Sequence, residues 1–418
     1  MTSTQPLLAN EWICSPGVKL HGAGFIVSPA EAEFLGLGRR DGLERHIRPY
    51  RNGRDLMARS RRAMVIDLLG LSDEDVRLRF PEVYQQLLTT VKPERRSNNR
   101  ATYRDNWWLF GEPRRELRPA LAGLTRYIAT VETAKHRVFQ FLDAAILPDN
   151  MLVCIASDNS FHLGVLSSRH SVTWSLRAGG WLGVGNDPRY SKSGVFDPFP
   201  FPTAGPAQRA RIGRLAEELD ANRKEVLALH PDLTLTGLYN LRDKVAAGEP
   251  LDLVEQDQRA RGRIDLLADL HRQIDVAVAD AYGWPADLPD EEVVARLVAL
   301  NAERRADEKR GRVEWLRPDY QLGRTDAARL PTGGPEQMEA LLPDARAPKP
   351  AFPRDLVGQT AAVFDALSGG GALTASEIAA RFAQGRRAEP RIAATLAALA
   401  RLGHAANQAD RFRLRRAA

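Results

Sequence analysis

The stretch DPFPFPTAGP, residues 197–206, divides the sequence into two parts with different patterns. Each proline removes a backbone donor and biases the residue before it away from helical dihedral angles, so this stretch is not part of a helix. We predict a connector here. A second proline-rich stretch, PDARAPKPAFP at 343–353, has the composition of a semi-rigid linker. Together the two stretches predict three domains: 1–205, 206–346 and 347–418.

The first domain mixes the patterns of strands and helices. MVIDLLGL (64–71) and NMLVCIAS (150–157) are short apolar runs of the kind found in buried strands. The segment Arg115–Leu142 shows helix-like spacing instead, through Leu117, Leu121, Leu124, Ile128 and Val131. The fold class predicted for the chain is therefore α+β, beginning with a mixed α/β domain.

The middle domain has a helical period almost throughout. Ala207–Leu229, Arg263–Tyr282 and Asp290–Gly311 all repeat their apolar residues every three to four positions. In the second of these segments the apolar residues fall on one face. We predict a mainly helical spacer domain whose acidic residues are largely its solvated surface.

The last domain has the pattern of a small winged helix-turn-helix. A helix is expected over Leu356–Leu367, Thr374 opens a second with Glu377 in a capping box, and Pro390 is tolerated in the first turn of a third. HAANQADRFRLRR (404–416) can form the hairpin, or wing. The third helix and the wing would present Arg391, Arg401, Arg411, Arg413, Arg415 and Arg416. DNA binding and protein docking both stay open for this fold.

Charge follows the same three-part division. The chain has 59 Lys+Arg and 53 Asp+Glu, a net charge of +6. Counted by predicted domain, the nets are 27 − 21 = +6, 21 − 27 = −6 and 11 − 5 = +6. Basic ends around an acidic middle indicate that the ends face a polyanion, and nucleic acid is the first candidate.

Basic residues gather in two places in the first domain. Residues 39–62 hold nine arginines against three acidic residues, together with Tyr50 and Asn52. Lys92–Arg118 holds eight basic and four acidic residues around Trp107 and Trp108. Guanidinium groups beside amides and aromatic rings suit phosphate and base-edge contacts, and Gly53 would allow a close backbone approach. Ordinary solvated surface is the alternative.

Several classes of protein are excluded. The longest apolar runs are well short of the roughly 20 residues that span a membrane, and the first 30 residues lack a secretory pattern, so a cytoplasmic protein is expected. Cys14 and Cys154 are too few for a disulfide framework or a thiolate metal site. Phosphate-loop, zinc-protease and serine-hydrolase motifs are absent, and His162 with His170 is weak support for a metal. We predict neither catalytic residues nor a metal site.

Longer strings resemble a known family. They match, in order, the target-recognition region of large adenine-specific DNA methyltransferases of restriction-modification and related phage-defence systems, followed by that family's helical region. The resemblance runs from residue 7 to about 415. Its most specific strings are GVKLHGAGFIVSPAEAEFLG (17–36), IRPYRNGRDL (47–56), VKPERRSNNR (91–100), GVLSSRHSVTW (164–174), VFDPFPFP (195–202) and WLRPDYQ (315–321).

The resemblance implies a function but not a complete enzyme. In this family an upstream domain binds S-adenosylmethionine and holds a flipped adenine at an Asn-Pro-Pro-Tyr/Phe motif. That motif is absent from this sequence, where Pro198–Pro202 matches the family's connector instead. We therefore expect the C-terminal half of a methyltransferase. It would bind no cofactor itself, and its catalytic half would be a separate chain or lost.

The resemblance also implies which residues contact double-stranded DNA. One motif contains Arg48, Tyr50, Arg51, Asn52 and Arg54, the second contains Lys92, Arg95, Arg96 and Arg100, and the third contains Ser167, Ser168, Arg169 and His170. Ser167 and Ser168 could instead cap a helix that includes Trp174, and Asp55 could pair with a nearby arginine. Two other functions stay open: an assembly subunit without DNA readout, and a methyltransferase active alone.

Overall fold

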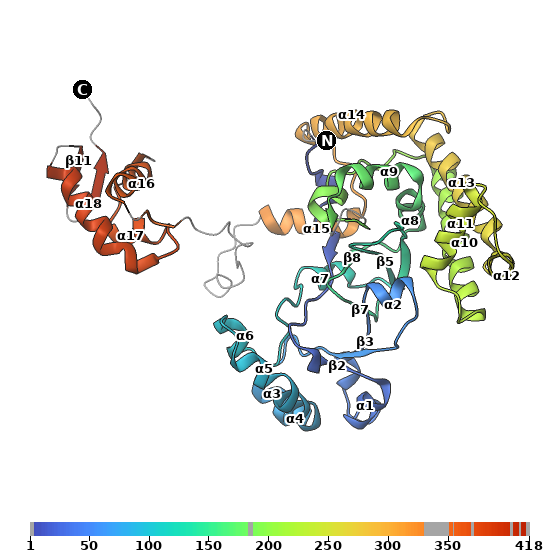
Figure 1. The fold of residues 1–418 in the computed structure, drawn as a ribbon, viewed down its shortest axis with the longest axis horizontal. Helices are drawn as coiled ribbons and strands as arrows, with labels where there is room; N and C mark the ends of the chain where they lie inside the picture. The colour runs from blue at the N-terminus through green and yellow to red at the C-terminus, as the bar shows by residue number, and fades with distance from the viewer. Residues whose placement is uncertain are drawn as a thin grey trace. The chain divides into compact units, whose positions relative to one another are not determined.

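The computed structural model describes residues 4–182, 187–329, 351–353, 355–368, 372–401, 404–408 and 411–414. The chain forms two compact units, Met1–Leu330 and Pro331–Ala418. Both units are drawn in Figure 1. The predicted domain boundary at 346/347 lies outside the described residues. Among the described helices, none combines the length and the apolar character of a membrane span.

The larger unit contains two four-stranded sheets. The first is antiparallel throughout, and its strands in spatial order are β1 (Cys14–Pro16), β8 (Leu152–Ile155), β5 (Arg126–Val131) and β6 (Gln140–Asp143). The strand predicted within 150–157 is confirmed as β8. Cys14 lies on β1 and Cys154 on the adjacent strand β8, and both cysteines are free and buried.

The helix predicted from Arg115 to Leu142 is wrong. Only Leu117–Leu121 is helical (α7), and Gly123 then turns the chain with a φ of 78°. The segment continues as β5 and β6. Residues Tyr127, Ile128 and Ala129 of β5 are all fully buried, because this strand lies between two others with both faces covered. When both faces of a strand are buried, its apolar residues no longer alternate with polar ones, and their spacing can fit a helical period as well.

The second sheet is mixed. Its order is β2 (Ile26–Val27), β4 (Met64–Ile66), β3 (Ile47–Arg51) and β7 (Leu147–Pro148), with β3 and β7 parallel and the other pairs antiparallel. The strand predicted within 64–71 is confirmed as β4. Three short helices contribute to a separate core, α1 (Pro29–Phe34), α3 (Asp73–Arg79) and α4 (Pro81–Thr90). Two more, α5 (Lys92–Arg96) and α6 (Ala101–Asp105), follow α4 in the chain.

Helices complete the larger unit on the side of the first sheet (Figure 1). The helices predicted over 207–229, 263–282 and 290–311 are confirmed as α10 (Pro206–Leu229), α13 (Ile264–Tyr282) and α14 (Asp290–Lys309). α10 packs against α13 and against α8 (Ser160–Ser167), and α14 packs against α9 (Arg169–Ala178). The remaining helices are α11 (Leu235–Ala246), α12 (Leu253–Arg261) and α15 (Pro318–Arg329).

The proline-rich stretch at 197–206 is a junction inside this unit. One hydrophobic core runs from Ile13 to Leu297 and includes Phe199 and Phe201, which are 1% and 8% exposed. The structure therefore differs from the predicted separation at 205/206, since residues on both sides share that core. Prolines identify a non-helical segment, but they do not show whether it is exposed.

The smaller unit has winged-helix topology. Helices α16 (Leu356–Ser368), α17 (Ala375–Ala379) and α18 (Glu389–Arg401) precede the hairpin of β11 (Ala405–Gln408) and β12 (Arg411–Leu414). An isolated antiparallel bridge joins Leu373 to Phe412 of β12. The predicted capping box is confirmed, with Thr374 N donating to Glu377 Oε2 (2.8 Å) and Glu377 N to Thr374 Oγ1 (3.2 Å). Arg415 and Arg416 lie outside the described residues.

The shared core predicts a cooperative response to one small substitution. A Cβ at Gly164 in α8 would lie 2.4 Å from Ile212 Cγ2 and 3.1 Å from Ile212 O in α10. Gly164→Ala should therefore force α8 and α10 apart and lower the free energy of unfolding of the larger unit by roughly 1–3 kcal/mol. Calorimetry should show one transition for the larger unit, at a lower temperature.

Gly323→Ala is the matched control. This helical glycine has no atom near its would-be Cβ, so the substitution should be neutral or stabilise by up to about 1 kcal/mol. A Gly164→Ala protein in which residues 206–329 melt separately from the sheets would contradict the shared core.

Candidate nucleic-acid interface

The junction between β3 and α2 (Gly53–Met57) is built by Asn52 and Asp55. Asn52 Oδ1 accepts a hydrogen bond from Asp55 N (3.0 Å), and Asp55 Oδ2 accepts one from Asn52 N (3.1 Å), which makes a capping box. Asp55 also accepts from the Arg61 guanidinium at 2.8 and 3.1 Å, as the pairing alternative anticipated. Burial alone would raise the pKa of Asp55, but the hydrogen bonds from Arg61 and the backbone hold it below its usual value. The junction is therefore fixed by an ionised carboxylate.

Gly53 allows the backbone of α2 to approach β5 of the same protein, and not DNA. A Cβ at this position would lie 2.9 Å from Val131 Cγ1, so its absence lets α2 lie against β5. The expected role of Gly53 at DNA is corrected accordingly.

Tyr50 is also corrected. Its ring is 2% exposed, and its hydroxyl donates to Asp149 Oδ2. Burial, followed by this hydrogen bond, raises the pKa of the phenol well above its usual value. Tyr50 therefore ties β3 to the segment after β7 and is not available to stack on a base.

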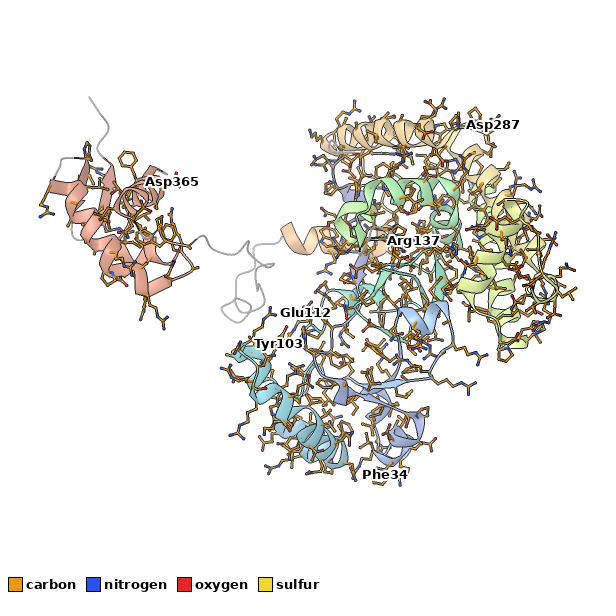
Figure 2. All side chains as sticks on the ribbon, viewed as in Figure 1. Phe34, Tyr103, Glu112, Arg137, Asp287 and Asp365 are labelled. Atoms are coloured by element: carbon orange, nitrogen blue, oxygen red, sulfur yellow. The ribbon has the colours of Figure 1, made fainter. Side chains whose placement is uncertain are left out.

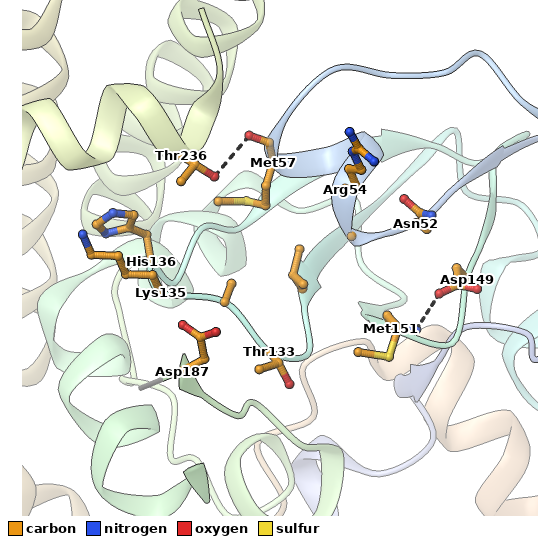
Figure 3. Close-up of a pocket in the computed structure, with 13 residues that line it drawn as sticks. Asn52, Arg54, Met57, Thr133, Lys135, His136, Asp149, Met151, Asp187 and Thr236 are labelled. Carbon is orange, nitrogen blue, oxygen red and sulfur yellow. Dashed lines mark hydrogen bonds between the residues drawn. The ribbon is translucent and has the colours of Figure 1, made fainter. Parts of the chain in front are cut away.

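A cleft of about 460 Å³ opens beside α2 (Figure 3). Its lining comes from five places in the chain: α2, the segment between β5 and β6, the turn after β7, β10 (Asp187–Pro188) and the start of α11. The polar lining residues are Asn52, Arg54, Thr133, Lys135, His136, Asp149, Asp187 and Thr236. Lys135 Nζ and His136 Nε2 lie 2.7 and 2.8 Å from Asn240 Oδ1, so these two side chains are already engaged. Arg54 has no such partner among the described residues.

Arg54 belongs to a set of arginines that the rest of the protein does not neutralise. Arg54, Arg59 and Arg62 are exposed, and the half-buried Arg51 donates only to Tyr50 O (2.9 Å). We call these four residues the arginine segment. In the part of the chain that the structure describes, no carboxylate lies within ion-pair distance of any of them.

Three arginines of the helical region behave differently. Each of three near α12 lies 2.7 Å from a carboxylate: Arg259 from Asp265, Arg261 from Asp257 and Arg263 from Glu225. Exposed pairs of this kind contribute little stability, but they cancel charge locally. Uncompensated positive charge therefore persists at the arginine segment, where an anion can use it.

Arg48 is half-buried and committed to the backbone. Its guanidinium donates to Ala144 O (2.9 Å) and Ala145 O (3.1 Å), and burial lowers its pKa. It joins β3 to the turn before β7, so its predicted contact with DNA would require these bonds to break.

The second predicted motif divides into one structural residue and three exposed ones. Arg95 is 1% exposed, donates to Leu20 O (2.7 Å) and Leu109 O (3.2 Å), and stacks its guanidinium 5.0 Å from the Tyr103 ring centre. Its predicted DNA contact is corrected, because a phosphate cannot reach it. Lys92, Arg96 and Arg100 are exposed; Lys92 lies over Trp107 and Arg100 donates to the Tyr103 hydroxyl.

The third predicted motif is structural. Ser167, Ser168 and His170 are all buried, and burial lowers the pKa of His170 to about 4, so its imidazole is neutral. Ser168 occupies the N-cap position of α9, the helix that includes Trp174, but its hydroxyl donates to Val165 O (2.7 Å). Arg169 pairs with Asp290 at 2.6 Å. Their predicted DNA contacts are corrected, because Ser167, Ser168 and His170 are buried and Arg169 joins α9 to α13 and α14 through its bonds to Asp275 and Asp290.

Sequence reasoning missed two buried cations, Arg137 and Arg223. Arg137, labelled in Figure 2, is 8% exposed and donates to Thr130 Oγ1, Val131 O and Pro188 O. Burial lowers its pKa to about 10, which leaves it charged at neutral pH. The only signal was its position beside the apolar pair Val138 and Phe139.

Metal binding finds no support within the described ranges, where no three His, Cys, Asp or Glu side chains are grouped to hold an ion. His162 is fully buried, and burial lowers its pKa to about 3. What the site around α2 offers instead is the unpaired guanidinium groups of the arginine segment, which can bind an anion.

Comparison with known proteins places these features in a family context. Residues 14–203 match the family model described as the MmeI target recognition domain. A solved structure of the Type IIL restriction-modification enzyme MmeI in complex with DNA is similar, with a TM-score of 0.55 and 19% sequence identity. The alignment covers 72% of this chain and 36% of that one, so this chain spans about a third of that enzyme and shares its fold there. No curated protein matches the chain.

A pair of neighbouring arginines tests the division within the second motif. Arg95→Ala should lower the free energy of unfolding by roughly 3 kcal/mol, because two buried carbonyls lose a charged donor and a cavity remains. Arg96→Ala, the matched exposed control, should change it by less than about 0.5 kcal/mol. Urea denaturation measures both. Equal stabilities for the two variants would show that Arg95 does not support the fold.

Proposed function

We propose that this chain is the sequence-recognising portion of a site-specific adenine-N6 DNA methyltransferase in a restriction-modification or related phage-defence system. It binds double-stranded DNA through the arginine segment. The S-adenosylmethionine-dependent methyl transfer belongs to a catalytic domain outside the sequence given, either on a separate chain or on a longer one.

The unneutralised charge of the arginine segment carries this proposal. It lies within the region that matches a target recognition domain, and Arg54 lies at a cleft with several polar groups. Guanidinium groups donate in pairs to phosphate oxygens and to the O6 and N7 atoms of guanine. Arg259, Arg261 and Arg263 of the helical region are offset by carboxylates, whereas the charge of the arginine segment is not.

The fold supports the arginine segment as a positioned surface. Tyr50, the capping box of α2 and the Asp55–Arg61 pair all fix the backbone between β3 and β4. An interface residue held on a fixed backbone loses less entropy when it binds DNA. The similar enzyme MmeI was solved in complex with DNA, which is consistent with a role of this kind for the matched region.

Salt dependence tests the DNA contact. Binding of the chain to duplex DNA should weaken as salt rises. The double variant Arg54→Ala with Arg59→Ala should make the negative slope of log K against log salt less steep by up to about 2, because each phosphate contact contributes about 0.9. Fluorescence anisotropy over a series of salt concentrations gives the slope. Arg259→Ala, which removes a half-buried and paired arginine, is the control and should leave the slope unchanged.

An equal change of slope in the control and the double variant would show that only net charge matters. A wild-type chain whose affinity failed to rise as salt falls would remove the proposal altogether.

Methyl transfer tests the assignment of the chemistry. The chain lacks an Asn-Pro-Pro-Tyr/Phe motif, so labelled S-adenosylmethionine and mixed-sequence DNA should give no transfer with the chain alone. Adding a catalytic domain of the same family should give transfer at a defined adenine. Robust transfer by the chain alone would instead favour a complete enzyme.

A further inference from the structure

The smaller unit carries exposed arginines that its own structure does not use. Arg386 and Arg387 lie in the short 3₁₀ turn Gly385–Ala388, Arg391 lies in the first turn of α18, and Arg401 lies in its last. All four are exposed, and no described carboxylate pairs with them. By contrast, Arg411 of the wing donates to Ala372 O (3.0 Å) and to Glu377 Oε1 (3.0 Å), so it anchors β12 to α17.

The packing of α18 decides which way these arginines face. Ile392, Leu396 and Leu399 are buried in the core of the smaller unit, which also contains residues of α16 and α17. The opposite side of α18 is therefore the outer face of the helix-turn-helix. The wing follows the same rule: Phe412 packs against the core and Arg413, next along the strand, is exposed.

The outer face of α18 between its arginines is made of alanine. Ala393, Ala394 and Ala397 are all exposed. Methyl groups let a helix come close to a groove, but they neither donate nor accept hydrogen bonds and so cannot tell most base pairs apart. A helix of this composition can contribute to affinity but reads little sequence.

Charge selects the ligand. Residues 331–418 hold 12 basic and 8 acidic residues, a net of 12 − 8 = +4, and the outer face of α18 in this unit consists of arginine and alanine. In a helix-turn-helix the recognition helix lies in the major groove of DNA, between the phosphate backbones. The exposed apolar residues of the unit, Leu356 and Phe364, lie on α16 and not on this face.

We infer that the smaller unit is a second DNA-contacting module, which grips the duplex backbone through Arg386, Arg387 and Arg391 without reading its sequence. The recognition domain supplies specificity and the winged helix supplies sequence-independent affinity. This goes beyond the proposed function, because it assigns a separate surface and a separate task.

The test uses the full chain and a pool of random-sequence duplexes. A triple variant, Arg386→Ala with Arg387→Ala and Arg391→Ala, is compared with the wild type by measuring affinity across salt concentrations and by sequencing the bound fraction. A control triple variant removes the same charge from exposed helix positions, Arg211→Ala with Arg214→Ala and Arg272→Ala. Thermal melting checks that each variant is folded.

The expected result is a loss of affinity without a change of sequence preference. The negative slope of log K against log salt should become less steep by roughly 2–3, and affinity at moderate salt should drop at least tenfold. The sequences enriched in the bound fraction should stay the same, and the control triple should keep the wild-type slope. Ala394→Glu, which places a negative charge on the outer face of α18, should also weaken binding.

Three outcomes would overturn the inference. An unchanged slope in the triple variant and in Ala394→Glu would show that this face does not touch DNA. A changed set of enriched sequences would show that the winged helix reads bases. Equal losses in the control triple would reduce the effect to net charge. The Arg54→Ala with Arg59→Ala variant, run in the same assay, reports separately on the recognition domain, so that the two proposals can fail independently.

Discussion

The side-chain amide of Asn10 makes the interaction on which the larger unit depends. Its nitrogen lies 2.8–3.0 Å from the carbonyl oxygens of Phe196, Asp197 and Phe199, and Asn301 donates to Pro198 O at 2.7 Å. Prolines lack a backbone donor, and an unsatisfied buried carbonyl is costly. These two amides therefore allow the segment to lie inside the core, where it joins the sheets to the helices.

The arginines of the protein fall into three groups. Some, such as Arg95 and Arg137, are buried and hold backbone carbonyls together. Others pair with carboxylates on the helical surface. A third group has no carboxylate partner among the described residues and includes the arginine segment and the arginines at and just before α18. Composition reports only the sum of these groups, whereas binding of a polyanion depends on the third alone.

The sequence predicted the parts whose signals are local. The long helices α10, α13 and α14, the strands β4 and β8, and the capping box of Thr374 each follow from short-range periodicity or from side chains a few residues apart. Burial is not local, and this is why β5 was mistaken for a helix and why Tyr50, Arg95 and His170 were expected at DNA. A family motif marks residues that matter, but the partner of Arg95 is Leu20 O, 75 positions away in the chain. Only the folded structure separates a motif residue that binds from one that supports.

The central claim is that the arginine segment touches DNA. Ultraviolet cross-linking of the full chain to a photoreactive duplex, followed by mass spectrometry, tests it most directly. Our account predicts cross-linked peptides from residues 47–62, next to the cleft beside α2. Cross-links confined to the paired surface of α12 and α13, with none in 47–62, would contradict it.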